Sequence, residues 1–551
     1  MKRILLLLHT LRFLKIKQLV YRVYYRLRKP RLNDLPEPRL RNVLNSWSGA
    51  VFLSPATDDG ETFTFLGETG DLTRGWNNPD FSKLWLYNLH YQDDLNSVGA
   101  SERKALCQLL VENWIAANPP LQGNGWEPYC LSLRIVNWVK WLSCLQPDEV
   151  DPLWLRSLAC QADTLEQQLE FHILANHLFA NAKALVFVGS FLGGRQGDAW
   201  LKKGLSLLDQ EVAEQFLADG AHYELSPMYH ATLLWDMCDL LQLKQQTPLS
   251  ALNEREKLWR RVIEQGICSL SKLVHPDGDI AFFNDSTLGI APSLKQLEDY
   301  AVKLGCLPEP AAKIADSLYL NHLQSSGYLV IDWSNHHRAL LDVAKVGPDY
   351  QPGHAHADTL SFELSLFGQR VFVNSGISQY GEDAERHRQR STAAHNTLEV
   401  DGENSSEVWA GFRVARRATP FGLKVQEQCN LIQVNAAHDG YQRLPGKVTH
   451  QRQWFAEPGQ LVIEDQLTGH FTKAVAYFHV HPDVRLERLD ANHWQGYLPG
   501  GQVFDLSFEG GNAEQQSGTW HPAFGASIAN HCLVLALHTN EIRTRISWSE
   551  I

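Results

Sequence analysis

The feature that most constrains the fold is a change of apolar periodicity part-way along the 551-residue chain. Between residues 104 and 273, apolar side chains recur at helical spacing in segments of helix length. These segments are Lys104–Ala117, Leu131–Cys144, Leu153–Leu169, His172–Val188, Trp200–Phe216, Tyr229–Leu243 and Glu254–Leu273. Gly, Pro and Asp clusters separate them, with no strand-like run between. Serial helices of this kind predict packed helical hairpins.

From Tyr328 onward the pattern changes to short runs that are rich in Val, Ile, Phe and Thr and are bounded by turns. The runs are Tyr328–Trp333, Arg338–Val346, Leu360–Phe367, Leu431–Ala436, Gln460–Glu464, Ala474–Val480, Cys532–Leu537 and Ile542–Trp548. Regularly spaced short strands indicate an antiparallel β-sandwich. We therefore predict a multidomain α+β chain: a basic N-terminal helix and connector (1–45), a helical domain (46–320) and a β-sandwich (321–551).

Composition excludes several classes of protein. Hydrophobic residues make up 44% of the chain and charged residues 20%, which is typical of a folded globular protein. The net charge of −12 argues against a nucleic-acid partner, although a locally basic cleft still allows an anionic polymer. Nine scattered cysteines without CxxC spacing argue against a disulfide framework or a cysteine metal site. No apolar run reaches the length of about 18 residues that a membrane-spanning helix needs.

The N-terminal segment is basic. From Lys2 to Arg31 it has no acidic residue, and Leu, Ile, Val and Tyr are interleaved with the charges. The apolar run after Met1 stops at His9 without a small-residue cleavage site, so no cleavable signal peptide is predicted and a bacterial cytoplasm or periplasm stays open. The segment fits an amphipathic helix in peripheral contact with a membrane, or a helix packed on the body, which we favour. A homodimer is also left open.

Metal-competent side chains alternate in Gly353-His-Ala-His-Ala-Asp358. In an extended chain, residues two apart point the same way, so His354, His356 and Asp358 are expected on one face. His395 follows later in a His-Asn-Thr turn. Imidazoles with an amide or carboxylate oxygen suit zinc or a similar divalent ion. The alternative is that these histidines only form hydrogen bonds inside the sandwich.

Two polar features interrupt the helical half. Asn176 and His177 form a pair within an otherwise apolar helix, where burial costs free energy unless the pair is hydrogen-bonded. Ser226 before Pro227 is typical of an N-cap with proline at the first helical position, which places Tyr229 in the opening turn of a helix. A satisfied core pair and ordinary packing aromatics are the alternatives.

Together these motifs resemble the heparinase II/III-like polysaccharide lyases. The resemblance covers most of the chain and rests on Asn176-His177, Ser226–His230, Gly353–Asp358, Ala394–Thr397 and Trp409–Arg413. It implies an incomplete (α/α) toroid followed by a β-sandwich. It also implies β-elimination in uronate-containing polysaccharides, namely glycosaminoglycans such as heparan sulfate, hyaluronan or chondroitin, with 4,5-unsaturated products. An alginate-type lyase and a non-catalytic carbohydrate-binding or scaffold protein in exopolysaccharide assembly are the alternatives.

The resemblance also implies catalytic roles and a metal. Asn176 matches the asparagine that neutralises the substrate carboxylate and His177 the adjoining histidine. Tyr229 matches the acid/base tyrosine and His354 a catalytic histidine, while the base, His177 or Tyr229, stays open. The metal ligands matched are His356 and His395, with Asn374 where relatives usually carry aspartate. The predicted cofactor is a divalent metal, zinc first, with manganese or calcium as alternatives, and no organic cofactor.

Further polar residues are predicted to contact the anionic substrate. Arginine suits carboxylate or sulfate recognition, so Arg134 is the first candidate, with Asn137 and His90 on neighbouring segments. Tyr380 approximates a further active-site tyrosine of the family. The stretch Asn284–Ser286 lacks the spacing of a calcium loop and is interpreted as a turn near the cleft.

Overall fold

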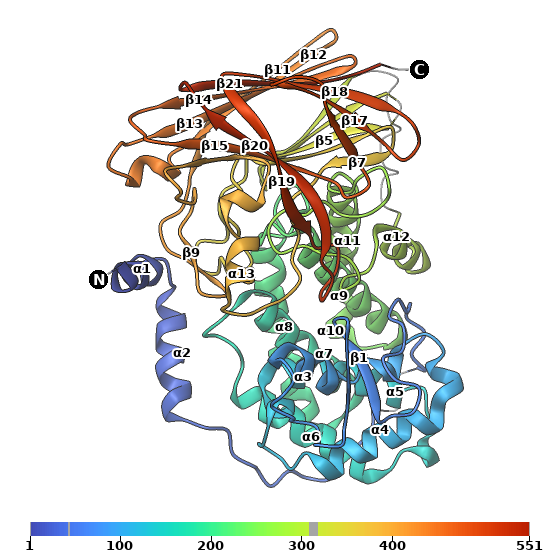
Figure 1. Ribbon diagram of the computed structural model, residues 1–551. Coiled ribbons are helices and arrows are strands. Elements are labelled where there is room, and N and C mark those ends of the chain that lie inside the picture. The colour runs from blue at the N-terminus through green and yellow to red at the C-terminus, as the bar shows by residue number, and fades with distance from the viewer. Residues whose placement is uncertain (1, 42–44, 308–317, 335, 550–551) are drawn as a thin grey trace.

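The computed structural model describes residues 2–41, 45–307, 318–334 and 336–549. A helical part forms one end of the molecule and two stacked antiparallel sheets form the other, as Figure 1 shows. The predicted class, a helical toroid followed by a β-sandwich, is confirmed. Among the described residues, no helix has the length and apolarity needed to cross a membrane.

All seven helices predicted from periodicity are present. The helices of this part are α3 (Lys83–Tyr91), α4 (Lys104–Ala117), α5 (Pro128–Leu142), α6 (Pro152–Gln167), α7 (Ala175–Phe191), α8 (Gly194–Gln215), α9 (Pro227–Gln246), α10 (Ser250–Asn253), α11 (Glu256–Leu270) and α12 (Leu294–Lys303). Helix α7 is buried on nearly every side, and glycines let α8 pack closely on it. A Cβ at Gly189 would lie 2.5 Å from the backbone nitrogen of Leu201. The central position of α7 fixes its N-terminal end, where Asn176 and His177 lie.

The sandwich consists of two antiparallel sheets. The outer sheet has the order β11 (Pro420–Gln428), β12 (Leu431–His438), β13 (Thr449–Glu457), β14 (Gln460–Thr468), β21 (Glu541–Trp548), β18 (Val503–Glu509), β17 (His493–Tyr497) and β16 (Arg485–Arg488). The inner sheet has the order β19 (Gly511–Trp520), β20 (Ile528–Leu537), β15 (Ala474–Val480), β7 (Gln369–Phe372), β6 (Phe362–Leu366), β5 (His337–Asp342), β4 (Tyr328–Trp333) and β3 (Tyr319–Leu323), with β8 (Leu398–Val400) beside β15. Strand β13 alternates buried and half-buried residues, whereas β4 and β6 are buried throughout. The inner sheet is thus covered on both faces.

The helical part and the sandwich share an apolar contact. Leu225 and Phe283, from loops of the helical part, pack with Tyr328 and Leu340 of the inner sheet. The change from helices to strands falls between the end of α12 and the start of β3 at Tyr319, slightly before the predicted boundary. The loops at this junction carry most of the candidate site.

The basic N-terminal segment forms two helices instead of the one predicted, α1 (Lys2–Leu11) and α2 (Ile16–Leu27). The expected packing on the body is present on one face of α2, where the buried Gln18 donates from Nε2 to the carbonyls of Ile173 and Tyr350, both at 3.2 Å. A connector follows, and residues 42–44 of its predicted span lie outside the described residues. A short hairpin, β1 (Thr62–Phe65) and β2 (Glu68–Asp71), precedes α3.

One local prediction is wrong: residues 354–358 form a loop before β6, not a strand. Their backbone groups bond to other loops instead of to a neighbouring strand. The carbonyl of His354 accepts from the amide of Asp285 at 2.9 Å, and the amide of Ala357 donates to the carbonyl of Arg390 at 3.0 Å. The loop nevertheless brings both His354 and His356 to the carboxylate of Asp285.

Candidate active site at the junction of toroid and sandwich

Strained backbone positions precede the site residues on three loops. Leu174 and Ala175, with φ of 72° and 55°, come directly before Asn176. Leu225, with φ of 60°, precedes the N-cap of α9, and Asn284, with φ of 56°, precedes Asp285. A non-glycine residue in this region costs about 1–3 kcal/mol, so the surrounding packing must hold these loops in place. Strain of this kind is typical of functional sites.

Tyr229 lies in the first turn of α9, as predicted. The Ser226 hydroxyl caps the helix by accepting from the Tyr229 amide at 3.1 Å. The Tyr229 ring stacks on His354 with centroids 3.9 Å apart, and its hydroxyl lies 3.1 Å from that of Tyr380. Burial raises the pKa of Tyr229 well above its ordinary value, so the phenol keeps its proton near neutral pH. Residues from two domains thus meet around one proton donor.

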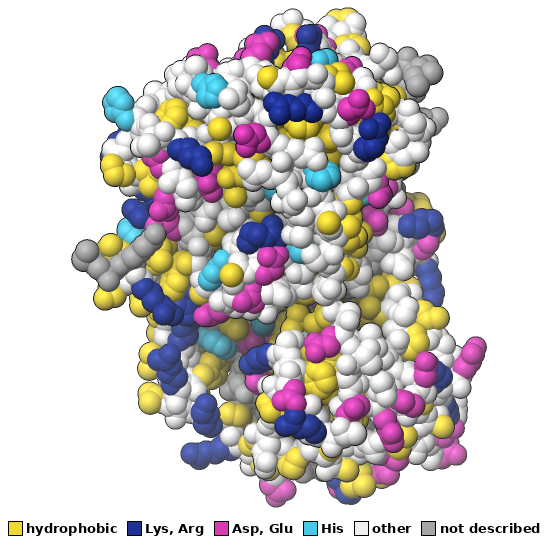
Figure 2. Space-filling view, in the orientation of Figure 1, with side chains coloured by type: hydrophobic (Ala, Val, Ile, Leu, Met, Phe, Trp, Pro, Cys, Tyr) yellow, Lys and Arg dark blue, Asp and Glu magenta, His cyan; other side chains and the backbone are white. Residues whose placement is uncertain are grey.

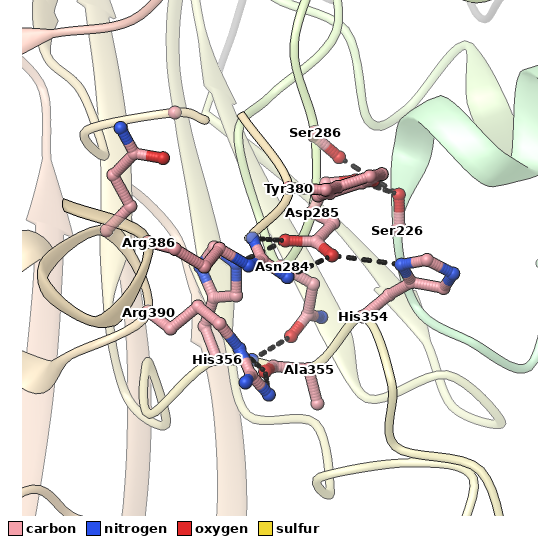
Figure 3. A network of polar contacts seen from close by, with 12 residues as sticks. Ser226, Asn284, Asp285, Ser286, His354, Ala355, His356, Tyr380, Arg386 and Arg390 are labelled. Carbon is pink, nitrogen blue, oxygen red and sulfur yellow. Dashed lines mark hydrogen bonds and ion pairs between the residues drawn. The ribbon is translucent and has the colours of Figure 1, made fainter. Parts of the chain in front are cut away.

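Asp285 is the hub of the polar network in Figure 3. It is fully buried and binds both arms of the Arg386 guanidinium; its carboxylate also accepts from His354 Nδ1 at 2.9 Å and His356 Nε2 at 2.8 Å. Burial alone would raise the pKa of Asp285, but Arg386 and the two imidazoles hold it well below its usual range. An ionised Asp285 holds a proton on His354 Nδ1, and His354 Nε2 lies 3.7 Å from a Glu224 oxygen.

A second carboxylate orients His177. Its Nδ1 lies 2.8 Å from Glu170 Oε1, and Asn181 donates to the other oxygen of Glu170 at 3.0 Å. Burial lowers the pKa of His177, but the charge and hydrogen bond of Glu170 together raise it above its ordinary value. The ring packs on Tyr129, with centroids 4.5 Å apart, and the side chain stays 28% exposed. His177 is therefore held in place with Nε2 free to exchange a proton.

Asn176 and Glu224 each carry a polar side-chain atom that forms no hydrogen bond with the residues that the structure describes. The side-chain amide of Asn176 makes no hydrogen bond to any residue that the structure describes, and its backbone amide lies 3.5 Å from Glu224 Oε1. Within the same described part of the chain, Glu224 Oε2 is buried and has no hydrogen-bond partner. Burial raises the pKa of Glu224, which favours the protonated acid. Both side chains are available to a ligand.

His356 and His395 form the core of a candidate metal centre. His356 Nδ1 lies 3.0 Å from His395 Nε2, while His395 Nδ1 donates to the carbonyl of Ser391 at 2.8 Å. Mainly through burial, the pKa of His356 falls to about 4 and that of His395 to about 3, so both rings are neutral. Two nitrogen lone pairs then face each other, and Asp358 brings its carboxylate into a group whose ligand atoms all lie within 4.8 Å of one another. This donor set fits a divalent cation.

Asn374 lies beside this group but is already engaged. Its backbone amide donates to Glu363 at 2.7 Å, and its side-chain oxygen accepts from the amide of Asn396 at 3.3 Å. Its side-chain nitrogen is buried without a hydrogen-bond partner among the described residues. Asp358 is thus the better-placed third ligand, and coordination by Asn374 stays a prediction.

Three of the residues predicted to bind substrate lie in the helical core instead. Arg134 is fully buried and donates to the carbonyls of His90 at 3.0 Å and Gly125 at 2.7 Å. Asn137 donates to the carbonyl of Tyr91 at 3.0 Å, and buried His90 accepts from Trp114 at 3.0 Å. These contacts hold α3 and α5 together, so the placement contradicts substrate contact by Arg134, Asn137 and His90. Tyr380 does lie in the site.

Two important site residues were not identified from the sequence. Glu224 stands two residues before the N-cap of α9, and its carboxylate lies 3.7 Å from His354 Nε2; its place just before the cap was the available signal. The sequence predicts only a turn at Asp285, and no local pattern distinguishes this residue from the many exposed turn aspartates. Its role depends on Arg386 and His354, which are far away in the sequence.

Comparisons with known proteins agree with this architecture. A heparin-sulfate lyase from Bacteroides stercoris is 26% identical over 254 residues, covering 42% of this chain and 36% of the lyase. Another from Pedobacter heparinus is 25% identical over 280 residues, covering 46% of this chain and 39% of that protein. The aligned part thus spans less than half the length of either relative.

Solved structures show the same fold. A crystal structure of heparinase III superimposes with a TM-score of 0.71 at 18% identity, covering 88% of this chain and 79% of that one. A heparan sulfate lyase mutant from Pedobacter heparinus gives a TM-score of 0.62 at 18% identity, with coverage of 97% and 88%. At this identity the likeness concerns the fold alone.

Two family models match consecutive parts of the chain. Residues 102–304 match the heparinase II/III N-terminus, which corresponds to the helical part. Residues 315–549 match the heparinase II/III-like C-terminal domain, which corresponds to the sandwich. Together the two matches span most of the sequence, in the order that the family requires. The chain belongs to the heparinase II/III-like family.

Proposed function

We propose that this protein is a polysaccharide lyase that cleaves glycosaminoglycan-type polymers beside a uronate by β-elimination. The observation that carries the proposal is the convergence of Asn176, His177, Tyr229 and His354 at the domain junction, each with its polar group oriented or free. The names of the related heparin-sulfate lyases support an anionic, uronate-containing polysaccharide as substrate. Neither paired glycosidase carboxylates nor a nucleophile is needed for this chemistry.

β-Elimination first requires that the uronate carboxylate be neutralised, because its charge opposes removal of the neighbouring C5 proton. The unpaired amide of Asn176 donates to one carboxylate oxygen. Burial raises the pKa of Glu224, and in its protonated form this carboxyl can donate to the other oxygen. A carboxylic acid kept neutral by an apolar site is an effective hydrogen-bond donor. These two groups stabilise the enolate-like charge that develops as C5–H breaks.

Proton transfer needs a base at C5 and an acid at the departing O4. His177 serves as base through Nε2, since the charge and hydrogen bond of Glu170 raise its pKa above the ordinary value and so strengthen the imidazole as a base. Tyr229 serves as acid because burial keeps its phenol protonated. His354 and Tyr380 hold the phenol by ring stacking and by a hydroxyl contact.

The products test this function directly. The protein is incubated with heparan sulfate, chondroitin, hyaluronan and alginate, and ultraviolet absorbance and product masses are recorded. We expect absorbance from a 4,5-unsaturated uronate and product masses that sum to the substrate without added water. Hydrated, saturated ends would exclude a lyase. Cleavage of alginate alone would support the alginate-type alternative, and binding without cleavage the scaffold alternative. The oligomeric state is a separate question, and the homodimer that the sequence left open stays a prediction.

We also propose that His356, His395 and Asp358 hold a divalent cation, with zinc as the first candidate. The facing lone pairs of the two neutral imidazoles and the nearby carboxylate support this set. A bound cation would supply positive charge that locks the loop before β6. Since His356 also donates to Asp285, the same set supports the residue that orients His354.

His395→Ala is expected to remove the bound metal and lower the melting temperature. Elemental analysis of protein prepared without chelator should give about one divalent ion per chain for the wild type and close to none for the variant. His438→Ala is the matched control, because His438 is equally buried in the sandwich but lies outside this group. Asp358→Asn should lose the ion and Asn374→Ala should keep it; the reverse result would restore Asn374 as the ligand. A metal-free wild type would contradict the site.

A further inference from the structure

Helix α2 has a face that belongs to the body of the protein. Gln18, Tyr21 and Tyr25 recur at spacings of three and four and point inward. Gln18 is 0% exposed, Tyr21 packs on Phe171 with centroids 4.7 Å apart, and the Tyr25 hydroxyl donates to the carbonyl of Leu169 at 2.5 Å. This face attaches α2 to the body of the protein. It does not explain the residues on the opposite side of the helix.

The opposite face of α2 is an exposed apolar stripe. Ile16, Val20, Val23 and Leu27 recur at spacings of four, three and four, and Ile16 and Leu27 are 79% and 83% exposed. Helix α1 adds Ile4, Leu5, Leu7 and Leu8, all exposed. Among the described residues, ten of the twenty-four exposed large hydrophobic side chains lie between residues 4 and 27. Such a concentration marks an interaction surface.

Positive charge flanks this stripe. Residues 2–31 contain ten Lys and Arg and no acidic residue, although the whole chain has a net charge of −12. On α2, Lys17 lies on one side of the stripe and Arg22 and Arg26 on the other. Figure 2 shows dark blue and yellow side chains intermixed along this edge, at the left of the molecule. An outward apolar stripe between basic side chains is typical of helices that lie in a membrane interface.

We propose that the N-terminal helices α1 and α2 dock the protein onto a membrane surface that carries anionic lipid headgroups. The acyl region accepts the apolar stripe and the headgroups pair with the flanking Lys and Arg. A polysaccharide would satisfy the basic residues but would leave Ile16, Val20 and Leu27 in water. A second copy of the N-terminal helices would bring two strongly basic segments together. The membrane is the partner that satisfies both features at once.

Docking would also place the candidate active site relative to the membrane. Buried Gln18 bonds to the carbonyls of Ile173 and Tyr350, which lie three residues before Asn176 and four before His354. Helix α2 is thus bonded to the two loops that lead into the site from the two domains. A docked protein would hold its cleft at a fixed position beside the bilayer, where it would meet polymer at the membrane surface.

Vesicle flotation of the full chain tests the proposal without reference to enzyme activity. We expect binding to phosphatidylcholine vesicles that contain phosphatidylglycerol, and binding at least about tenfold weaker to phosphatidylcholine alone or at high salt. Val20→Glu with Val23→Glu should weaken binding about tenfold or more. Arg26→Gln and Lys29→Gln should each weaken it roughly fivefold, as expected for one basic residue near an anionic surface.

Leu153→Glu, on α6, is the matched control because Leu153 is similarly exposed on the body, at 57%. It should bind vesicles like the wild type, and circular dichroism should show that all variants are folded. Absence of binding to the anionic vesicles at low salt would overturn the proposal, as would equal binding to both vesicle types. If the wild type binds heparan sulfate but not vesicles, and Arg26→Gln loses that binding, the surface belongs to the polysaccharide. If the wild type self-associates and the variant with Val20→Glu and Val23→Glu does not, the surface belongs to a second copy of the chain.

Discussion

Turnover of Tyr229→Phe is expected to fall by about a hundred- to ten-thousand-fold, the usual contribution of a general acid. The substitution keeps the ring that stacks on His354 and removes only the hydroxyl that lies 3.1 Å from Tyr380. Stability should change little, because the Ser226 cap bonds the backbone amide and not the phenol. Steady-state kinetics should show the loss in kcat, while substrate binding by the inactive variant survives.

Tyr223→Phe is the matched control for this experiment. Tyr223 lies in the same loop before α9, but its hydroxyl accepts from Tyr350 at 3.1 Å and forms no hydrogen bond with Tyr229 or His354 among the described residues. It should retain near wild-type turnover. If Tyr229→Phe itself stays active, the acid would have to be Tyr380. His177→Ala separates the base from the acid: general loss of activity supports His177, and residual cleavage of some uronate epimers would indicate that Tyr229 performs both steps.

Periodicity predicted most of the fold because each element carries its own signal. The helices from α4 to α11 bury apolar stripes that recur at helical spacing, and their ends follow local caps such as Ser226 before Pro227. Strands β13 and β21 of the outer sheet alternate buried residues with half-buried or exposed ones. The His354 loop could not be placed in this way, because its backbone bonds go to Asp285 and Arg390, which no local pattern reveals.

The candidate site was predictable only where motif and chemistry coincide. His356 and His395 come together as expected, and Tyr229 opens α9 as its N-cap indicates. The site predictions that failed did so because the burial of a side chain could not be predicted from the sequence. Arg134 has the chemistry of a carboxylate receptor but fills the helical core, whereas Glu224 gains its importance from being buried without a partner. Sequence spacing does not report which polar residue a distant loop will cover.

Asp285→Asn is expected to affect both stability and catalysis. The amide keeps the shape of the side chain but removes the charge that pairs with both arms of Arg386, and all of these groups are fully buried. An unpaired buried arginine costs about 3–5 kcal/mol. The amide also no longer fixes the proton of His354 on Nδ1, so the ring that stacks on Tyr229 is held less firmly; kcat should fall by about a hundred-fold, as for a small misplacement of a catalytic group. Denaturant unfolding and steady-state kinetics measure the two effects separately.

The variant Asp465→Asn separates the effect on stability from the effect on catalysis. Asp465 is buried in a similar ion pair with an arginine but lies outside the candidate active site. Its carboxylate accepts from Arg452 at 2.7 and 2.9 Å and from His450, much as Asp285 accepts from Arg386 and two imidazoles. Both variants should lose similar stability, since each leaves a buried guanidinium unpaired. Only Asp285→Asn should lose turnover per folded molecule. Equal turnover in the two folded variants would show that Asp285 acts as a structural anchor alone, and His354 would then need another group to hold its proton.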